Sequence, residues 1–117
     1  MRAYELRGHG LENLALAERP EPRPGPGQLL VRMRAASLNY RDLLVARGRY
    51  GRGGVRLPLV PLSDGAGEVV ETGLGATRFG AGDRVAGAFF QRWVDGPLDE
   101  EKAASALGGA VDGVLAE

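Results

Sequence analysis

The chain has 117 residues, no cysteine, and 15 basic residues balanced by 15 acidic ones. This length supports one domain with its own core, and the lack of cysteine excludes disulfides, thiol nucleophiles and thiolate metal sites. The balanced charge gives no field for nucleic acid or an anionic membrane. No apolar run reaches the roughly 18 residues that span a bilayer. We therefore expect a cytoplasmic protein with no nucleic-acid or membrane partner.

Glycine and proline are frequent, with 19 and 7 residues, and short aliphatic segments recur between them. Short aliphatic segments separated by glycine and proline are typical of a turn-rich, mainly β domain. The first strands are predicted at residues 2–6 and 14–18, joined by a loop that holds His9 as a solvated turn residue. Four prolines between residues 20 and 26 fix φ and withhold donors, which excludes a central strand there.

The clearest strand is predicted at residues 28–36. There Val31, Met33 and Ala35 alternate with two arginines at the strand period of two, so the three apolar residues should face the core.

A short helix is predicted to begin after Asn39 and to stop at Gly48. Asn39 can cap it, and Asp42 stands at the third helical position, close to a capping box. The helical spacing predicts one face made of Tyr40, Leu43, Leu44 and Arg47.

The second half of the chain should add two strands, at residues 65–72 and 84–90. A helix capped by Asp99 is predicted to run through Ala106, and residues 112–117 look like the start of another strand. The sequence has no internal repeat and no linker, so residues 1–117 are treated as one domain.

Two segments carry a family resemblance: residues 35–42 (Ala-Ala-Ser-Leu-Asn-Tyr-Arg-Asp) and residues 61–70 (Pro-Leu-Ser-Asp-Gly-Ala-Gly-Glu-Val-Val). Together they resemble the N-terminal substrate domain of the medium-chain, zinc-type alcohol dehydrogenases. The Asn-Tyr-x-Asp form is similar to the quinone oxidoreductase-like branch, which uses no zinc. Where zinc members of the family have a metal-binding Cys and His, this chain has Asn39 and Ser63.

The resemblance covers nearly the whole chain and implies a mainly β, GroES-like fold, a partly open β-barrel with short helices. It also implies an NAD(P)H-dependent reductase of a quinone, enone or similar carbonyl compound, of which these residues are a fragment that is inactive alone. No dinucleotide or Walker-type glycine motif occurs, so the main site for NADH or NADPH is expected outside this chain. Zinc is not expected, because Asp64 alone cannot supply its three or four ligands.

The resemblance also implies which residues face the reaction. Asn39 stands where zinc members have a catalytic Cys, Tyr40 where many have a phosphate-contacting residue, and Arg41 at the position of a proton-relay hydroxyl. A carbonyl that accepts hydride builds negative charge on oxygen, which donors on these three side chains can stabilise. Asn39 and Tyr40 are also the expected cofactor contacts. Tyr50 and Trp93 lie on predicted loops and are the expected substrate contacts, because flat substrates pack on flat side chains.

Simpler interpretations stay open. Asn39 and Asp42 can serve only as helix caps, Asp64 can be a turn carboxylate, and the aromatic residues can be core. The whole chain can also be a GroES-like structural or self-assembly module without catalysis. Against that alternative, the loop at residues 48–55 is short and rich in arginine, whereas ring-forming relatives need a long mobile loop with an apolar anchor. An unpaired terminal strand leaves room for a homodimer.

Overall fold

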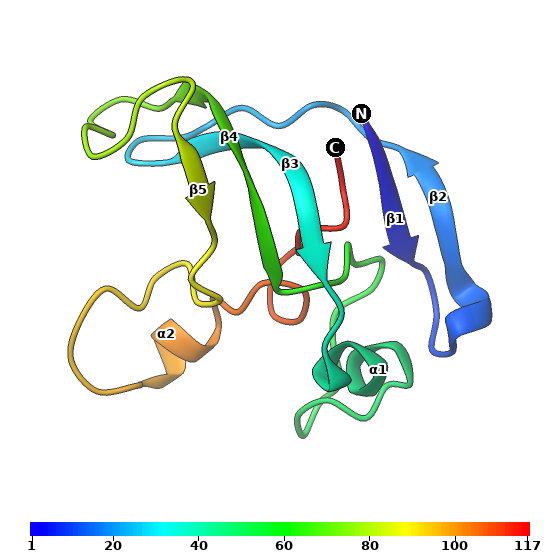
Figure 1. Ribbon diagram of the computed structural model, residues 1–117. Coiled ribbons are helices and arrows are strands. Elements are labelled where there is room, and N and C mark those ends of the chain that lie inside the picture. Colours follow the sequence, from blue (N-terminus) through cyan, green and yellow to red (C-terminus); the bar gives the residue numbers. More distant parts are fainter.

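Figure 1 shows the computed structural model, which describes residues 1–117. Five strands, two short helices and one 3-10 turn follow one another along the chain. They are β1 (Arg2–Leu6), the 3-10 turn (Leu11–Asn13), β2 (Leu14–Glu18), β3 (Leu29–Ser37), α1 (Tyr40–Ala46), β4 (Asp64–Thr72), β5 (Arg84–Ala86) and α2 (Glu100–Ala103). The four strands predicted before residue 73 are confirmed to within one residue at each end.

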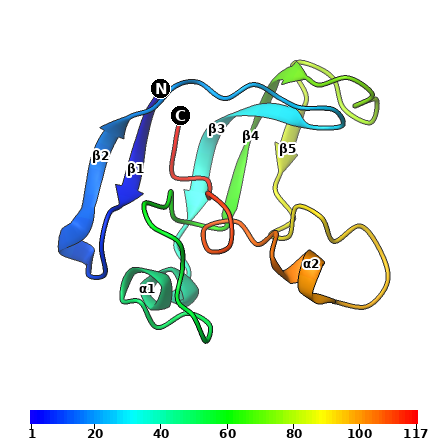
Figure 2. The same ribbon diagram turned by 180° about the vertical axis from the view of Figure 1, so that it is seen from behind.

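The strands form two antiparallel sheets that do not close into a barrel. One is the β1-β2 hairpin, and the other has three strands in the order β3-β4-β5. Figures 1 and 2 show the last residues of the chain, drawn in red, running between the hairpin and the larger sheet. There the Tyr4 amide donates to the Leu115 carbonyl at 3.0 Å, and the Gly113 amide donates to the Val60 carbonyl at 2.6 Å. The mainly β, partly open architecture is confirmed.

β4 can lie close to β3 because it carries a glycine, Gly67, at one of the paired positions. Gly67 is opposite Met33 in the ladder, and a Cβ at Gly67 would lie 2.7 Å from Val31 Cγ1 and overlap the Arg32 carbonyl oxygen. The register shifts between Met33 and Ala35, which breaks the alternation of faces. Ala35 is therefore exposed instead of facing the core, in contrast to the prediction from its spacing.

The last predicted strands are shorter than expected. β5 ends at Ala86 rather than near Phe90, because Phe89 has a φ of 64°, a value that no extended strand can include. The final residues pair with β1 only through an isolated bridge between Ala3 and Ala116, so they form no separate strand.

Helix α2 begins as predicted and ends early. The Lys102 amide donates to the Asp99 carboxylate at 2.8 Å, and this hydrogen bond lowers the pKa of the Asp99 carboxyl. The helix ends at Ala103 rather than Ala106, because Ala106 instead pairs with Phe90 in a β-bridge.

The core lies where helix α1 packs against the hairpin and the segment before β4. Its fully buried cluster contains Leu6, Val45, Ala46 and Leu59. The predicted helix face is corrected here: Val45 is completely buried, whereas Tyr40 and Arg47 are exposed. The Gly10 amide donates to the Ala46 carbonyl at 2.7 Å, so the hairpin loop covers the end of the helix and decides which side is buried.

The fold is unusually open. A folded monomer of 12.4 kDa is expected to expose about 6,100 Å², whereas this chain exposes 7,814 Å² and buries only 17 of its 117 residues. Neither helix has the length and apolar character required to cross a membrane.

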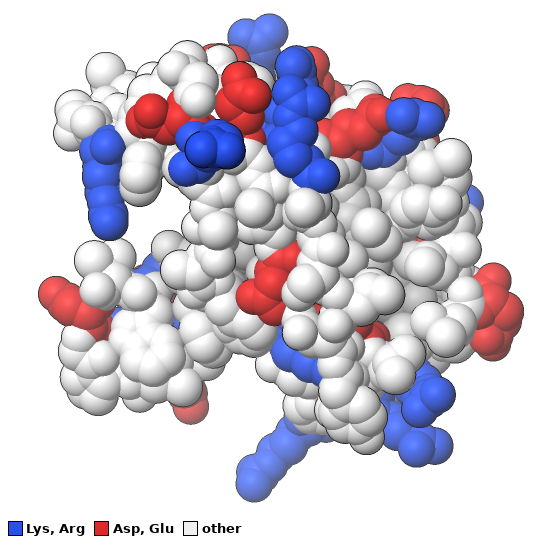
Figure 3. Space-filling view, viewed as in Figure 1, with Lys and Arg blue, Asp and Glu red and all other residues white.

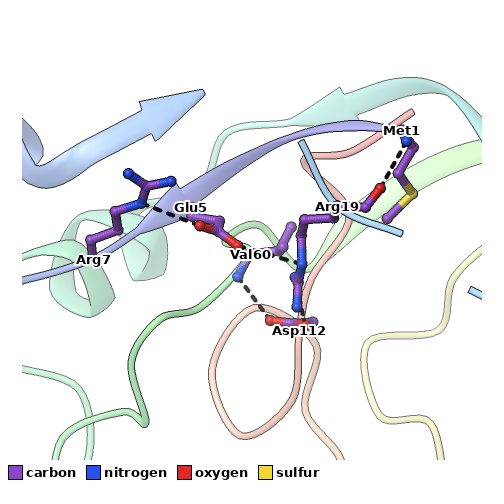
Figure 4. Close-up of polar contacts among 6 residues, drawn as sticks. All are labelled: Met1, Glu5, Arg7, Arg19, Val60 and Asp112. Atoms are coloured by element: carbon purple, nitrogen blue, oxygen red, sulfur yellow. Dashed lines mark hydrogen bonds and ion pairs between the residues drawn. The ribbon is translucent and has the colours of Figure 1, made fainter. Parts of the chain in front are cut away.

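Ion pairs fasten the end of the chain to the hairpin (Figure 4). Arg19 lies between two carboxylates, 3.5 Å from Glu5 and 2.8 Å from Asp112. Arg7 approaches Glu5 from the other side at 3.3 Å. Asp112 also accepts the Val60 amide at 2.9 Å, so one carboxylate serves both a cation and a backbone donor.

Asp112→Ala should lower the free energy of unfolding by about 2 kcal/mol, because it leaves the Val60 amide without an acceptor. Asp112→Asn keeps an oxygen for that amide and removes only the charge, so it should cost less than about 1 kcal/mol. Urea unfolding of the two variants measures both values. Equal losses would show that the ion pair, and not the backbone hydrogen bond, carries the effect.

Candidate active site

The candidate site starts at the N-terminus of helix α1. Asn39 has an extended backbone, with φ −121° and ψ 154°, and its amide donates to the Asp42 carboxylate at 2.8 Å. This is the reciprocal hydrogen bond of a capping box. Asp42 is only 9% exposed, and its second carboxylate oxygen is buried without a partner. The carboxylate of Asp42 thus caps the helix.

The Asn39 side chain also reaches the start of β4. Its Nδ2 donates to Asp64 Oδ2 at 2.5 Å, and the hydroxyl of the buried Ser63 donates to the same oxygen at 3.0 Å. Asp64 lies opposite Ser37 in the β3-β4 ladder, which brings β4 beside the residues that precede α1. We call Asn39, Ser63 and Asp64 the polar cluster.

The polar cluster orients the Asn39 amide. An ionised carboxylate only accepts hydrogen bonds, so the nitrogen of the amide, and not its oxygen, must face Asp64. An NH₂ group has two donors, and Asp64 uses one of them. The second N–H of Asn39 has no partner within the chain, and it can donate to a bound molecule.

The polar cluster does not fit a zinc ion. Zinc sites in proteins are built from Cys, His and carboxylate ligands, whereas this cluster has one carboxylate, one amide and one hydroxyl. No group of three or more His, Cys, Asp or Glu side chains that could hold a metal occurs anywhere in the described chain.

The Arg41 side chain packs against two aromatic rings, and not beside Asn39, with which it is expected to face the reaction. Its guanidinium carbon lies 4.4 Å from the centre of the Tyr50 ring and 4.7 Å from that of Phe89. Its Nη1 donates to the Leu107 carbonyl at 3.0 Å. The other two nitrogens are buried and have no partner. Two of the three guanidinium nitrogens of Arg41 are thus enclosed within the fold.

Tyr40 points outward and joins neither the polar cluster nor Arg41. Its side chain is 73% exposed, beside Leu38 at 84%. The phenol hydroxyl makes no hydrogen bond within the chain, so it is free to contact another domain or a bound molecule.

Tyr50 and Trp93, the predicted substrate contacts, lie at the two ends of one aromatic row. The rings of Tyr50 and Phe89 both contact the guanidinium of Arg41, and Phe90 follows Phe89 at 4.5 Å between ring centres. Trp93 lies 5.4 Å from Phe90, and its indole N–H donates to the Gly96 carbonyl. Sequence reasoning missed Phe89 as the link, because a loop residue without periodicity gives no signal of what it packs against.

Two cavities lie elsewhere on the molecule. One of about 430 Å³ is bounded by β3 together with Met1, Pro22 and Val70, and the other, of about 320 Å³, lies between the hairpin and residues 115–117. None of the five predicted site residues lines either cavity. Figure 3 shows that charged side chains gather along the upper and lower edges of one face, with a largely uncharged area between them.

Comparison with known proteins gives a consistent assignment. Residues 25–117 match the model of the alcohol dehydrogenase GroES-like domain. The chain is 46% identical over 88 residues to a zinc-type alcohol dehydrogenase-like protein of Schizosaccharomyces pombe, which covers 75% of this chain and 25% of that protein. It is 38% identical over 85 residues to an acryloyl-coenzyme A reductase of Metallosphaera sedula, covering 73% of this chain and 25% of that protein.

Solved structures agree. A cobalt- and zinc-bound thermostable alcohol dehydrogenase from Pyrobaculum aerophilum superposes with a TM-score of 0.83 at 32% identity, covering 97% of this chain and 36% of that one. The chain spans about a quarter of the length of the two curated relatives. It belongs to the alcohol dehydrogenase GroES-like domain family, as an N-terminal domain of the medium-chain alcohol dehydrogenases and quinone oxidoreductases.

Proposed function

We propose that this chain is the substrate domain of an NAD(P)H-dependent reductase that transfers hydride to a quinone, enone or similar carbonyl compound without zinc. The observation that carries the proposal is the polar cluster. At the positions of the metal-binding Cys and His of zinc-dependent relatives, Asn39 and Ser63 instead hydrogen-bond to one carboxylate of Asp64.

When bound, the cofactor would supply a hydride to the carbon of the acceptor, whose π electrons would move to its oxygen, and that oxygen would take a proton from solvent. The free N–H of Asn39 would donate to this oxygen as its negative charge develops. Donors held in place before the reaction stabilise such a charge more effectively than water does. Asp64 supports Asn39 by holding its amide in the required orientation.

The residues present fit one side of a nicotinamide site. The unpartnered hydroxyl of Tyr40, exposed next to Asn39 in the sequence, is a donor suited to an amide or phosphate oxygen of NADH or NADPH. The chain has no glycine-rich dinucleotide motif, so the cofactor would be bound mainly by another domain. The 117 residues alone are therefore proposed to be inactive. A cysteine-free chain also suits the reducing cytoplasm proposed as its location.

A hybrid enzyme tests this function. Residues 1–117 replace the matching N-terminal segment of the Metallosphaera sedula acryloyl-coenzyme A reductase, and oxidation of NADH and NADPH is followed with menadione, a methylated naphthoquinone, as acceptor. We expect turnover by the hybrid and none by the isolated 117 residues. A hybrid with native-like circular dichroism that oxidises neither cofactor with menadione, an enone or an aldehyde would refute the proposal. Turnover by the isolated chain would refute the claim that it is inactive alone.

A further inference from the structure

We propose that Arg41 is a positioning residue that holds residues 88–105, the side lobe, against helix α1. The side lobe carries Trp93, so this inference rests on the proposed function only where it assigns the lobe to acceptor binding. The physical role of Arg41 is argued from its contacts alone.

The side lobe is a self-contained part of the fold. Every hydrogen bond made by residues 88–105 ends within residues 88–107, including those of Ser105 and Lys102. The one ion pair of the lobe, between Lys102 and Asp99, is internal as well. Figures 1 and 2 show the lobe at the opposite end of the molecule from the hairpin, and Figure 3 shows an open notch above it. Hydrogen bonds beyond Leu107 therefore do not fix the position of the lobe, which depends on side-chain contacts with the body.

Arg41 provides that contact at the point where the lobe leaves and rejoins the body. The guanidinium stacks on Phe89 at the start of the lobe and donates to the carbonyl of Leu107 just after its end. The Leu107 amide in turn donates to the Phe89 carbonyl at 3.0 Å. Arg41, Phe89 and Leu107 thus form a closed triangle of contacts, and the Tyr50 ring also contacts the guanidinium.

The contacts of this triangle hold the backbone of Phe89 in a conformation that a bulky residue rarely adopts. Phe89 has a φ of 64°, a left-handed conformation that is rare for a bulky residue and persists only where the surroundings enforce it. The enforcing contacts are those just described, one to its ring and one to its carbonyl. Removal of Arg41 takes away the ring contact and leaves a strained residue at the base of the lobe.

The position of Arg41 favours a role in packing over direct contact with a bound acceptor. Its Nε and Nη2 are buried without partners, and Nη2 lies so close to Gly109 that a side chain there would overlap it. Burial removes the guanidinium from water, which costs free energy. Its attraction to the rings of Tyr50 and Phe89 offsets part of this cost. Arg41 therefore acts through the aromatic row, whose far end is Trp93, and it connects this row to the helix that follows Asn39.

The distance between the lobe and helix α1 can be measured by energy transfer, because the composition of the chain allows a unique donor and a unique label. The chain contains one tryptophan and no cysteine, so Trp93 is a unique energy donor. R47C adds a unique labelling site at the exposed residue that follows helix α1. A naphthalene label on that thiol accepts energy from Trp93, and the transfer efficiency reports the distance between the lobe and the helix. The measurement uses the 117-residue chain, without cofactor or acceptor, so its outcome is separate from turnover by the hybrid enzyme.

We expect R41M to lose transfer efficiency relative to the R47C parent, with unchanged far-UV circular dichroism. The matched control is R52M, which changes an exposed arginine on the loop of Tyr50 and should keep the parent value. R41K keeps the charge and a donor but not the flat group that covers two rings, so its transfer should also fall below the parent. A global loss of stability would lower the melting temperature without moving the native-state transfer.

Parent-level transfer in R41M overturns the proposal. If R41M loses the native circular dichroism, R41K decides, and parent-level transfer in R41K overturns the stacking role of Arg41. Loss of transfer in R52M equal to that in R41M also overturns it, because the effect would then not be specific to the triangle.

Discussion

Gly67→Ala is expected to lower the free energy of unfolding by about 3 kcal/mol or more, which is a large part of the total stability of a small domain. Gly67 lies in the central strand of its sheet, between β3 and β5. A Cβ there overlaps the Arg32 carbonyl oxygen, a backbone atom that cannot rotate away as a side chain can. Both ladders must shift to admit one methyl group. Urea unfolding followed by circular dichroism measures the loss.

The chain offers a matched control for this substitution. Gly53 has open space around its Cβ direction and no positive φ, so Gly53→Ala should leave stability unchanged or raise it slightly through the unfolded state. Equal effects at the two positions would show that close strand approach at Gly67 is not a stability constraint.

Asn39→Ala should reduce kcat of the hybrid enzyme with menadione by about 100-fold, because it removes a preorganised donor to the developing negative charge. Asp64→Asn should reduce kcat by about tenfold, since a neutral amide orients Asn39 less strictly than a carboxylate does. KM should change less than kcat in both variants, because the interaction strengthens in the transition state. Steady-state kinetics at saturating NADPH separate the two constants.

Asn13→Ala is the control for these variants. Asn13 is the only other asparagine in the chain and lies in the hairpin loop, where it donates to the His9 carbonyl. This variant should keep the parent kcat. If Asn39→Ala also keeps it, Asn39 is only a helix cap, which is the simpler interpretation that its sequence position allows.

The local elements could be predicted from the sequence because their signals are local. The β1-β2 hairpin and the caps at Asn39 and Asp99 each depend on a few neighbouring residues. The buried face of α1 could not be predicted, because the hairpin loop decides it through a contact between Gly10 and Ala46. Phe89 likewise ends its strand through a backbone conformation that its side chain does not encode.

In the candidate site, too, the sequence predicted the residues but not the contacts that they make with distant parts of the chain. Family resemblance placed Asn39 and Ser63 at metal-binding positions, but it did not show that both would hydrogen-bond to Asp64. The direction of Arg41 was also beyond sequence reasoning. Successive residues of an α-helix point about 100° apart, and the rings and carbonyl that receive Arg41 come from loops without periodicity. Tyr40 and Arg41 are neighbours in the sequence and nevertheless face solvent and core.

The hybrid enzyme should transfer hydride without a metal. The hybrid is treated with a chelator until its metal content is negligible, and its rate of NADPH oxidation with menadione is compared before and after. We expect the same rate in both states, with no gain when zinc is added back. A rate that disappears on chelation and returns with zinc would show that the reaction depends on the metal.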